Sequence, residues 1–88
     1  MKYLVMIPKK VDKIICKMPK KAKATLFTLL DDLASTGPVQ PRYQNYSKLG
    51  KDRYHCHLSY HWVACWHCEN GKYEVEVYYV GSRESAPY

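Results

Sequence analysis

The chain has 88 residues, a length that favours one compact domain, residues 1–88, with a single small hydrophobic core. Fourteen lysines and arginines against eight aspartates and glutamates give a net charge of +6, and 47% of the residues are apolar, which argues against wholesale disorder. No apolar run approaches the ~18 to 20 residues of a membrane span, and the apolar run at the start is too short for a signal peptide. We therefore expect a soluble, basic, cytoplasmic protein.

The composition is rich in aromatic residues for so small a protein. Nine tyrosines and two tryptophans accompany the positive charge. A basic surface interleaved with aromatic side chains suits an anionic, stacking partner, of which nucleic acid is the first candidate. An acidic protein partner fits the charge equally well. The four cysteines are expected to be reduced thiols.

The first half of the chain predicts one strand and two helices. Residues 3–7 form a short, partly β-branched apolar run that is typical of a strand. Apolar residues then recur at helical spacing up to Met18, and Pro19 ends that helix and suits the first turn of the next. A second apolar stripe predicts a helix that ends near residues 35–38. Residues 37–52 are expected to be a loop with a short strand around residues 42–46.

The second half of the chain predicts strands. Between residues 54 and 69 the even positions are apolar and the odd positions are rich in histidine, the pattern of a strand with one face on the core. An interruption is expected near residues 59–61, because sixteen strand residues in a row would be unusually long. Asn70-Gly71 predicts a tight hairpin. A last strand follows at residues 72–80, and in it one face is shared by Tyr73, Val75, Val77 and Tyr79.

The predicted fold class is therefore α+β. It consists of a two-helix hairpin packed on a small, mainly antiparallel sheet, in the order β-α-α-β-β-β. Cys65 and Cys68 form a C-x-x-C motif, but a separation of three within a strand places them on opposite faces. No second pair completes the four ligands of a zinc site. We expect buried core cysteines, no metal and no cofactor.

His55 and His57 are the most promising chemical pair. Residues two apart on a strand project from one face, so the two rings are expected to stand side by side, opposite the apolar positions. Histidine acts as a general acid or base near neutral pH; two solvated histidines are the alternative interpretation. Arg83, just past the last strand, can bind a phosphate through its guanidinium or form an ion pair with Glu84.

Together these features resemble the RelE/ParE superfamily of small bacterial toxins, and within it the RelE-like mRNA interferases, over essentially the whole chain. The element order is one basis of the resemblance. Others are Lys48-Leu49-Gly50 before the central strand, the central segment 53–66, and the ending Val80-Gly81-Ser82-Arg83 with Tyr88.

The resemblance implies the toxin of a type II toxin–antitoxin pair, which binds mRNA in the ribosomal A site and cuts it without a metal. The 2′-hydroxyl attacks the neighbouring phosphate, so the site needs a base, an acid and positive charge. The implied roles are an acid–base pair for His55 and His57, charge stabilisation for Arg83, and stacking or proton donation for Tyr88. The implied partners are a cognate antitoxin, the ribosome, mRNA, and operator DNA through the antitoxin.

A further set of residues is expected to bind RNA, and a solvated surface is the alternative interpretation for its lysines. The set consists of Lys9, Lys10, Lys13, Lys17, Lys20, Lys21, Lys48, Arg53 and His61.

One departure from the superfamily supports a rival hypothesis. Members often carry an arginine in a Tyr-Arg pair after the central turn, whereas this chain reads Tyr60-His61-Trp62-Val63. The departure favours a catalytically inactive binding module that acts with its antitoxin as a transcriptional corepressor. A ParE-like gyrase inhibitor is a third hypothesis, against which the paired histidines argue, and a zinc-binding interaction domain is the last.

Overall fold

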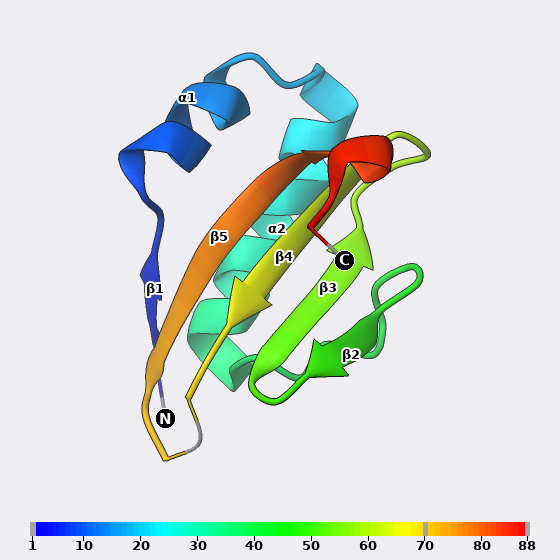
Figure 1. Cartoon of the computed structure of the whole chain (residues 1–88). Coiled ribbons are helices and arrows are strands. Elements are labelled where there is room, and N and C mark those ends of the chain that lie inside the picture. The colour runs from blue at the N-terminus through cyan, green and yellow to red at the C-terminus, as the bar shows by residue number, and fades with distance from the viewer. Residues whose placement is uncertain (1, 70, 88) are drawn as a thin grey trace.

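The computed structural model describes residues 2–69 and 71–87. Its five strands form one mixed sheet in the order β1-β5-β4-β3-β2, in which β1 pairs parallel to β5 and the other pairs are antiparallel. Both helices lie on one side of the sheet, and the C-terminal segment lies on the other (Figure 1). The elements are β1 (Leu4–Met6), α1 (Lys9–Cys16), α2 (Lys20–Thr36), β2 (Ser47–Gly50), β3 (Arg53–His57), β4 (Trp62–His67), β5 (Glu74–Ser82) and the 3-10 turn η1 (Arg83–Ser85).

Proline and glycine mark the bounds of the helices. Pro8 and Pro19 immediately precede α1 and α2, where a missing backbone N–H costs nothing. Gly37 ends α2: its φ is 91°, and its N–H donates to the Leu33 carbonyl. A Cβ on Gly37 would lie 2.6 Å from the Tyr3 ring, so the glycine also lets β1 approach the end of α2.

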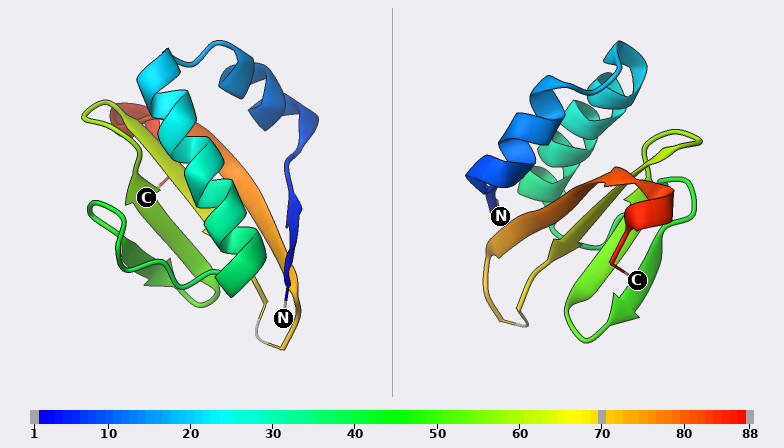
Figure 2. Two further views of the ribbon diagram at one scale, coloured as in Figure 1. Left: turned by 180° about the vertical axis from the view of Figure 1, so that it is seen from behind. Right: turned by 45° about the horizontal axis from the view of Figure 1, so that its top comes forward.

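The core lies between α2 and the sheet. Figure 2 shows α2 running across the back of the strands. The side chains of Leu26, Leu29 and Leu33 are fully buried there, each worth about 1.5–3 kcal/mol of transfer free energy. They belong to the same cluster as Trp66, whose indole N–H donates to the Pro38 carbonyl at 3.0 Å.

The α+β fold class and the helical hairpin are confirmed. The sheet has five strands, one more than the expected order β-α-α-β-β-β contains. That strand is β2, and it follows residues 42–46. The expectation of a strand within 42–46 is wrong, because these residues form turns: Asn45 has φ of 54°, and the Tyr46 N–H donates to the Tyr43 carbonyl. The interruption near residues 59–61 is confirmed, since β3 ends at His57 and β4 begins at Trp62. The expected hairpin turn at Asn70-Gly71 includes Asn70, which lies outside the described residues.

A β-bulge in β5 changes which side chains face away from the helices, on what we call the open face. Cys65 pairs with Tyr79, and the next residue, Trp66, pairs with Val77. Tyr78 is therefore an extra residue in β5. The period of two restarts after it, so Tyr78 and Tyr79 both project from the open face.

The bulge corrects one sequence expectation. Val75 and Val77 face the core as expected, but Val80, rather than Tyr79, continues that face. The Tyr79 ring lies over Gly81 instead, where an added Cβ would come within 2.7 Å of its hydroxyl oxygen. A single inserted residue moves every later side chain to the opposite face.

Within the described residues, no helix is long and apolar enough to cross a membrane.

Candidate functional site

The open face of the central strands carries the two histidines. His55 and His57 project from β3 to the same side, with ring centroids 5.8 Å apart and planes inclined by 60°. This is the neighbouring arrangement that their spacing predicts. Across the sheet, His55 is paired with Cys65 and His57 with Val63.

The two histidines differ in their contact with water. The side chain of His55 is buried, with 7% of its surface exposed, and its Nδ1 lies 3.0 Å from the Ser47 hydroxyl of β2. Burial lowers the pKa of His55; the neighbouring His57 lowers the pKa further, and a hydrogen bond with Ser47 opposes both. His55 is therefore neutral at pH 7, whereas His57 is half-buried.

The alternative interpretation, in which both histidines are solvated, is wrong for His55, whose side chain is buried. Strand β2 flanks β3 on one side, and on the other side Cys65 of β4 is fully buried on the open face. Tyr78, in the bulge of β5, lies beside the Cys65 thiol. Figure 1 also shows the C-terminal segment passing in front of the central strands.

Arg83 stands at the end of β5, beside the loop that joins β3 and β4. Its backbone N–H donates to the His61 carbonyl at 2.9 Å, and its guanidinium carbon lies 4.7 Å from the centroid of the Tyr60 ring. The Arg83 side chain is exposed, and among the described residues no carboxylate lies within ion-pair distance of it, Glu84 included. The guanidinium is therefore positioned by an aromatic ring and available to an anion.

Arg83 and His57 line the same pocket, which has a volume of about 350 Å³. Its lining comprises Gln44, Asn45, His57, Ser59, Tyr60 and Arg83. The pocket combines a fixed positive charge, an imidazole that can exchange a proton, and amide and hydroxyl donors. Such a set can hold a phosphate and move a proton to or from an oxygen next to it.

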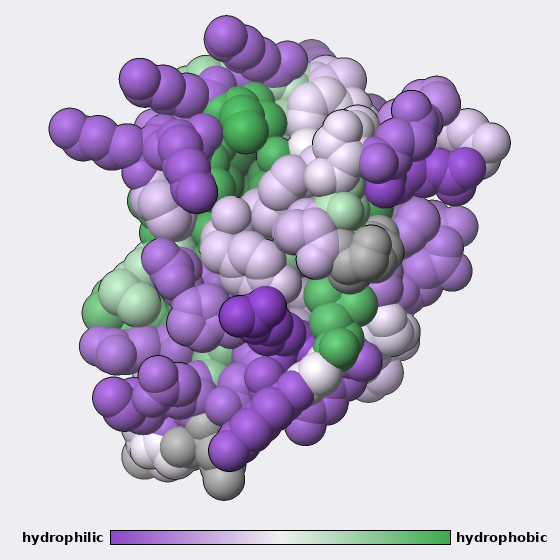
Figure 3. Space-filling view, viewed as in Figure 1, coloured by the Kyte–Doolittle hydropathy of each residue, from purple (hydrophilic) through white to green (hydrophobic). Residues whose placement is uncertain are grey.

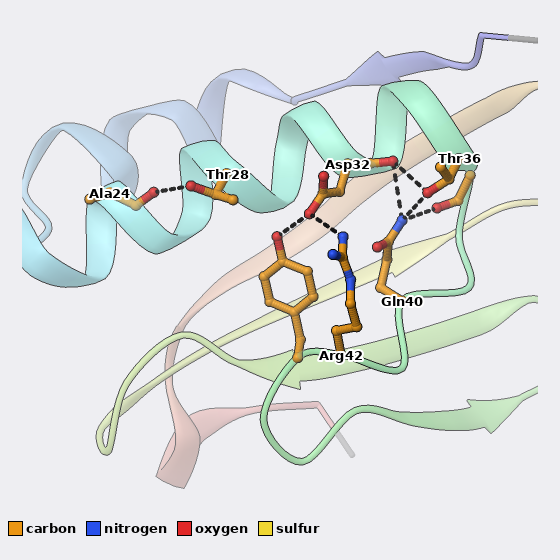
Figure 4. Close-up of polar contacts among 8 residues, drawn as sticks. Ala24, Thr28, Asp32, Thr36, Gln40 and Arg42 are labelled. Atoms are coloured by element: carbon orange, nitrogen blue, oxygen red, sulfur yellow. Dashed lines mark hydrogen bonds and ion pairs between the residues drawn. The ribbon is translucent and has the colours of Figure 1, made fainter.

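Sequence reasoning missed Gln44 and Asn45, which lie in the loop between α2 and β2. This loop is fastened to α2, as Figure 4 shows for the polar contacts of Asp32 and Gln40. The Asp32 carboxylate accepts a 2.6 Å hydrogen bond from the Tyr43 hydroxyl and lies 3.5 Å from the Arg42 guanidinium. Burial, followed by the bond to Asp32, raises the pKa of Tyr43, so its hydroxyl stays a donor.

The side-chain amide of Gln40 adds a second attachment. It donates to the Thr36 hydroxyl at 2.9 Å and to the Gly37 carbonyl at 2.8 Å, at the end of α2. Further along the loop, the Gln44 carbonyl accepts from the His57 backbone N–H at 2.8 Å. No local motif in the sequence marks these contacts, because they join the loop to residues on other elements.

The six expected RNA-binding lysines of the helices are all exposed, and the structure does not bring them to the pocket. They lie on α1 and at the start of α2, on the side of the sheet opposite the open face (Figure 2). In Figure 3, hydrophilic side chains project from the upper left of the molecule, where α1 lies in Figure 1. Their contact with RNA stays a prediction.

The remaining members of that set lie in three places. His61 is next to the pocket, and its ring meets the Tyr60 ring edge-on at 4.7 Å. Lys48 pairs with Tyr54 in the sheet, so it belongs to the core side of β2, where its Nζ lies 5.8 Å from the Tyr54 ring centroid. Arg53 lies at the far end of the open face. Tyr88 lies outside the described residues.

The cysteines are free thiols. Burial raises the pKa of Cys56 to about 12 and that of Cys65 to about 11, so neither is a reactive thiolate at neutral pH. Cys68 belongs to the core cluster and Cys65 to the open face, the opposite faces that their spacing predicts. Among the described residues, no group of three histidine, cysteine or acidic side chains could hold a metal ion.

Comparisons with known proteins match at the level of structure. No family model matches the chain, and a search of curated proteins finds no match. A RelE–RelB complex from the archaeon Pyrococcus horikoshii OT3 contains a chain that is 20% identical, with a TM-score of 0.77 over 98% of this chain and 100% of that one. A mutant of the E. coli toxin RelE in the free state is 19% identical, with a TM-score of 0.73 over 98% of this chain and 88% of that one.

A third neighbour comes from a YoeB–YefM complex of Staphylococcus aureus. It is 9% identical, with a TM-score of 0.70 over 94% of this chain and 99% of that one. The chain therefore has the RelE-like fold of toxin–antitoxin toxins. The expected fold is confirmed.

Proposed function

We propose that this protein is the toxin of a toxin–antitoxin pair and acts in the cytoplasm as a ribosome-dependent, metal-independent mRNA endonuclease. The observation that carries the proposal is the pocket in which His57 and the exposed guanidinium of Arg83 face the same space. It lies beside His55 on the open face of a RelE-like sheet.

The proposed reaction needs no group beyond the side chains and the RNA. The 2′-oxygen forms a bond to the adjacent phosphorus as the bond to the 5′-oxygen breaks, which leaves a 2′,3′-cyclic phosphate and a 5′-hydroxyl. His57 exchanges the protons, taking one from the 2′-hydroxyl or giving one to the leaving oxygen. Arg83 binds the phosphate and stabilises the added negative charge. Tyr88 is proposed to stack on the substrate or donate a proton.

His55 has a different role in this proposal. Because burial keeps its ring neutral and Ser47 holds its Nδ1, His55 orients His57 and accepts or relays a proton, while His57 meets the RNA. The cognate antitoxin is proposed as the partner that restrains the toxin. The support for it is that the Pyrococcus and Staphylococcus neighbours were each solved as complexes, with RelB and YefM.

The test is primer extension on mRNA bound to programmed ribosomes. We expect cuts in the A-site codon with the wild type. The cuts should be lost with His57→Ala and with Arg83→Ala, and weakened about 10- to 1,000-fold with His55→Ala. Folded wild-type protein that makes no cut would refute the nuclease. Cuts that persist in Arg83→Ala would place the phosphate elsewhere.

A second candidate function is a catalytically inactive binding module that acts as a corepressor with its antitoxin. Two observations favour it: His55 is buried and does not line the pocket, and His61 stands in the segment where the superfamily often has an arginine. In that case the complex with the antitoxin would bind operator DNA tightly, while the free protein would leave mRNA intact. DNA breaks in intoxicated cells would instead indicate gyrase poisoning.

A further inference from the structure

A second cluster of polar side chains occupies the other end of the open face. Arg53, His67 and Glu76 are paired across β3, β4 and β5, so they form one row over three strands. Tyr78 lies two residues after Glu76 on β5, so it projects from the same face and joins the row. These four residues line a pocket of about 310 Å³ that is separate from the pocket of Arg83.

The contacts within the cluster leave it able to bind a ligand. The His67 Nε2 donates to Glu76 Oε1 at 2.7 Å, and no donor of the described residues bonds the second carboxylate oxygen of Glu76. The His67 and Tyr78 rings lie 5.9 Å apart, and the Arg53 guanidinium carbon lies 5.9 Å from the Tyr78 ring centroid. The side chains of His67 and Glu76 are 38% and 36% exposed.

These groups match the chemistry of an unpaired nucleobase. Single-stranded RNA bases are bound by stacking on aromatic rings or arginine planes and by hydrogen bonds to their edges. A carboxylate accepts hydrogen bonds only, and the guanine edge offers it two adjacent donors, N1–H and the 2-amino group. Guanine also presents O6 and N7 to a guanidinium. Uracil places a carbonyl on each side of its one N–H, which a carboxylate repels.

We infer that Arg53, His67, Glu76 and Tyr78 form a guanine pocket that reads one base of the bound RNA. The inference rests on the proposed function for the identity of the ligand as single-stranded RNA. His57 and Arg53 are four residues apart on β3, a distance of about 13 Å. A phosphate at the Arg83 pocket and a base at this pocket therefore belong to nearby nucleotides of one strand. Glu76 selects the base, and Arg53 and Tyr78 hold it.

The test measures binding without cleavage. The probe is a short 2′-O-methyl oligouridine with one central guanosine, compared with the same oligomer carrying inosine, which lacks the 2-amino group. Fluorescence anisotropy of the full chain should give roughly tenfold tighter binding of the guanosine oligomer. Glu76→Gln should abolish that preference. Asp31→Asn, which removes one exposed negative charge from the helix side of the molecule, should keep it.

Two outcomes would overturn the inference: equal binding of the two oligomers by the wild type, or a preference that survives in Glu76→Gln. If Glu76→Gln fails to fold, Arg53→Gln tests the same pocket at an exposed position; it should weaken binding of both oligomers, because inosine keeps O6 and N7, and unchanged affinity for both would overturn the inference. Ribosomal cleavage with no guanosine preference in binding would refute the pocket and leave the nuclease standing. A guanosine preference without cleavage would refute the nuclease and support the pocket.

Discussion

At the scale of single residues, His55 and His57 have the same side chain on the same face of one strand and different surroundings. His55 is buried beside Ser47 and Cys65, while His57 opens into the pocket that Arg83 lines. A neutral imidazole whose Nδ1 contacts a hydroxyl is held in one ring orientation, which suits a positioning role. The exposed partner is better placed to exchange protons with a bound substrate.

The lowered pKa of His55 predicts a pH dependence of stability. The ordinary pKa of a histidine side chain is 6.5, so between this pH and the lower pKa of the folded state, the unfolded chain binds the extra proton. The free energy of unfolding therefore falls as the pH falls through this window, and the contribution of neutral His55 is complete above about pH 6.5. Urea denaturation from about pH 7 to about pH 5 should show this loss.

The matched variant is His55→Gln, which keeps a hydrogen-bonding side chain and removes the titration. Its free energy of unfolding should be lower than that of the wild type at neutral pH and should change less on acidification. The other three histidines are common to both proteins, so the difference between the two curves isolates His55. Parallel curves would contradict the prediction.

At the scale of elements, the pocket depends on a loop that belongs to no strand. Gln44 and Asn45 line it, and the loop that carries them is attached to α2 through Asp32. The Tyr43 hydroxyl makes the shortest of these contacts. A hydrogen bond to a carboxylate is stronger than one between neutral groups. The bond from Tyr43 to Asp32 is therefore the main interaction that attaches the loop to α2.

Tyr43→Phe should therefore loosen the loop. We expect the free energy of unfolding to fall by about 1–2 kcal/mol, because a charge-assisted hydrogen bond is lost. Backbone amides of residues 44–46 should exchange faster with deuterium, and cleavage on ribosomes should weaken. Tyr73→Phe is the control, since Tyr73 is exposed. Equal protection of the loop in both variants would show that Asp32 does not hold it.

Much of this architecture is predictable from sequence, and the exceptions have physical causes. Helix bounds follow from Pro19 and Gly37, which act locally. The face from which Tyr79 projects cannot be predicted locally, because a bulge inserts one residue without changing composition or hydropathy. The burial of His55 also escapes prediction, since the Ser47 hydroxyl beside its ring comes from another strand. His57 and Arg83 come from distant parts of the chain, and only the fold brings them to one pocket.

At the scale of the whole molecule, the lysines of the helices and the proposed site lie on opposite sides of the sheet. The lysines of α1 and the start of α2 lie on the helix side, while the histidines, Arg83 and the bulge tyrosines lie on the open face. In the proposed function, the helix side contacts ribosomal RNA and the open face holds the mRNA. This separation suits a protein that binds its substrate on a ribosome.

Replacement of Lys9, Lys10 and Lys13 by glutamine should weaken ribosome binding. If the three lysines contact RNA phosphates, the slope of the logarithm of affinity against the logarithm of salt concentration should fall by roughly 2. Cosedimentation with ribosomes at several salt concentrations measures it. The control variant, with glutamine at Lys2, Lys51 and Lys72, has the same net charge and should keep the wild-type slope. Equal slopes in both variants would assign the helix lysines to a solvated surface.

The pairing of the first strand with the last has a consequence for the order of synthesis. Leu4 of β1 is opposite Glu74 of β5, so β1 has no strand to pair with until nearly the whole chain has been translated. Arg83 follows later still. A chain released early therefore lacks both the partner of its first strand and the guanidinium of its proposed site.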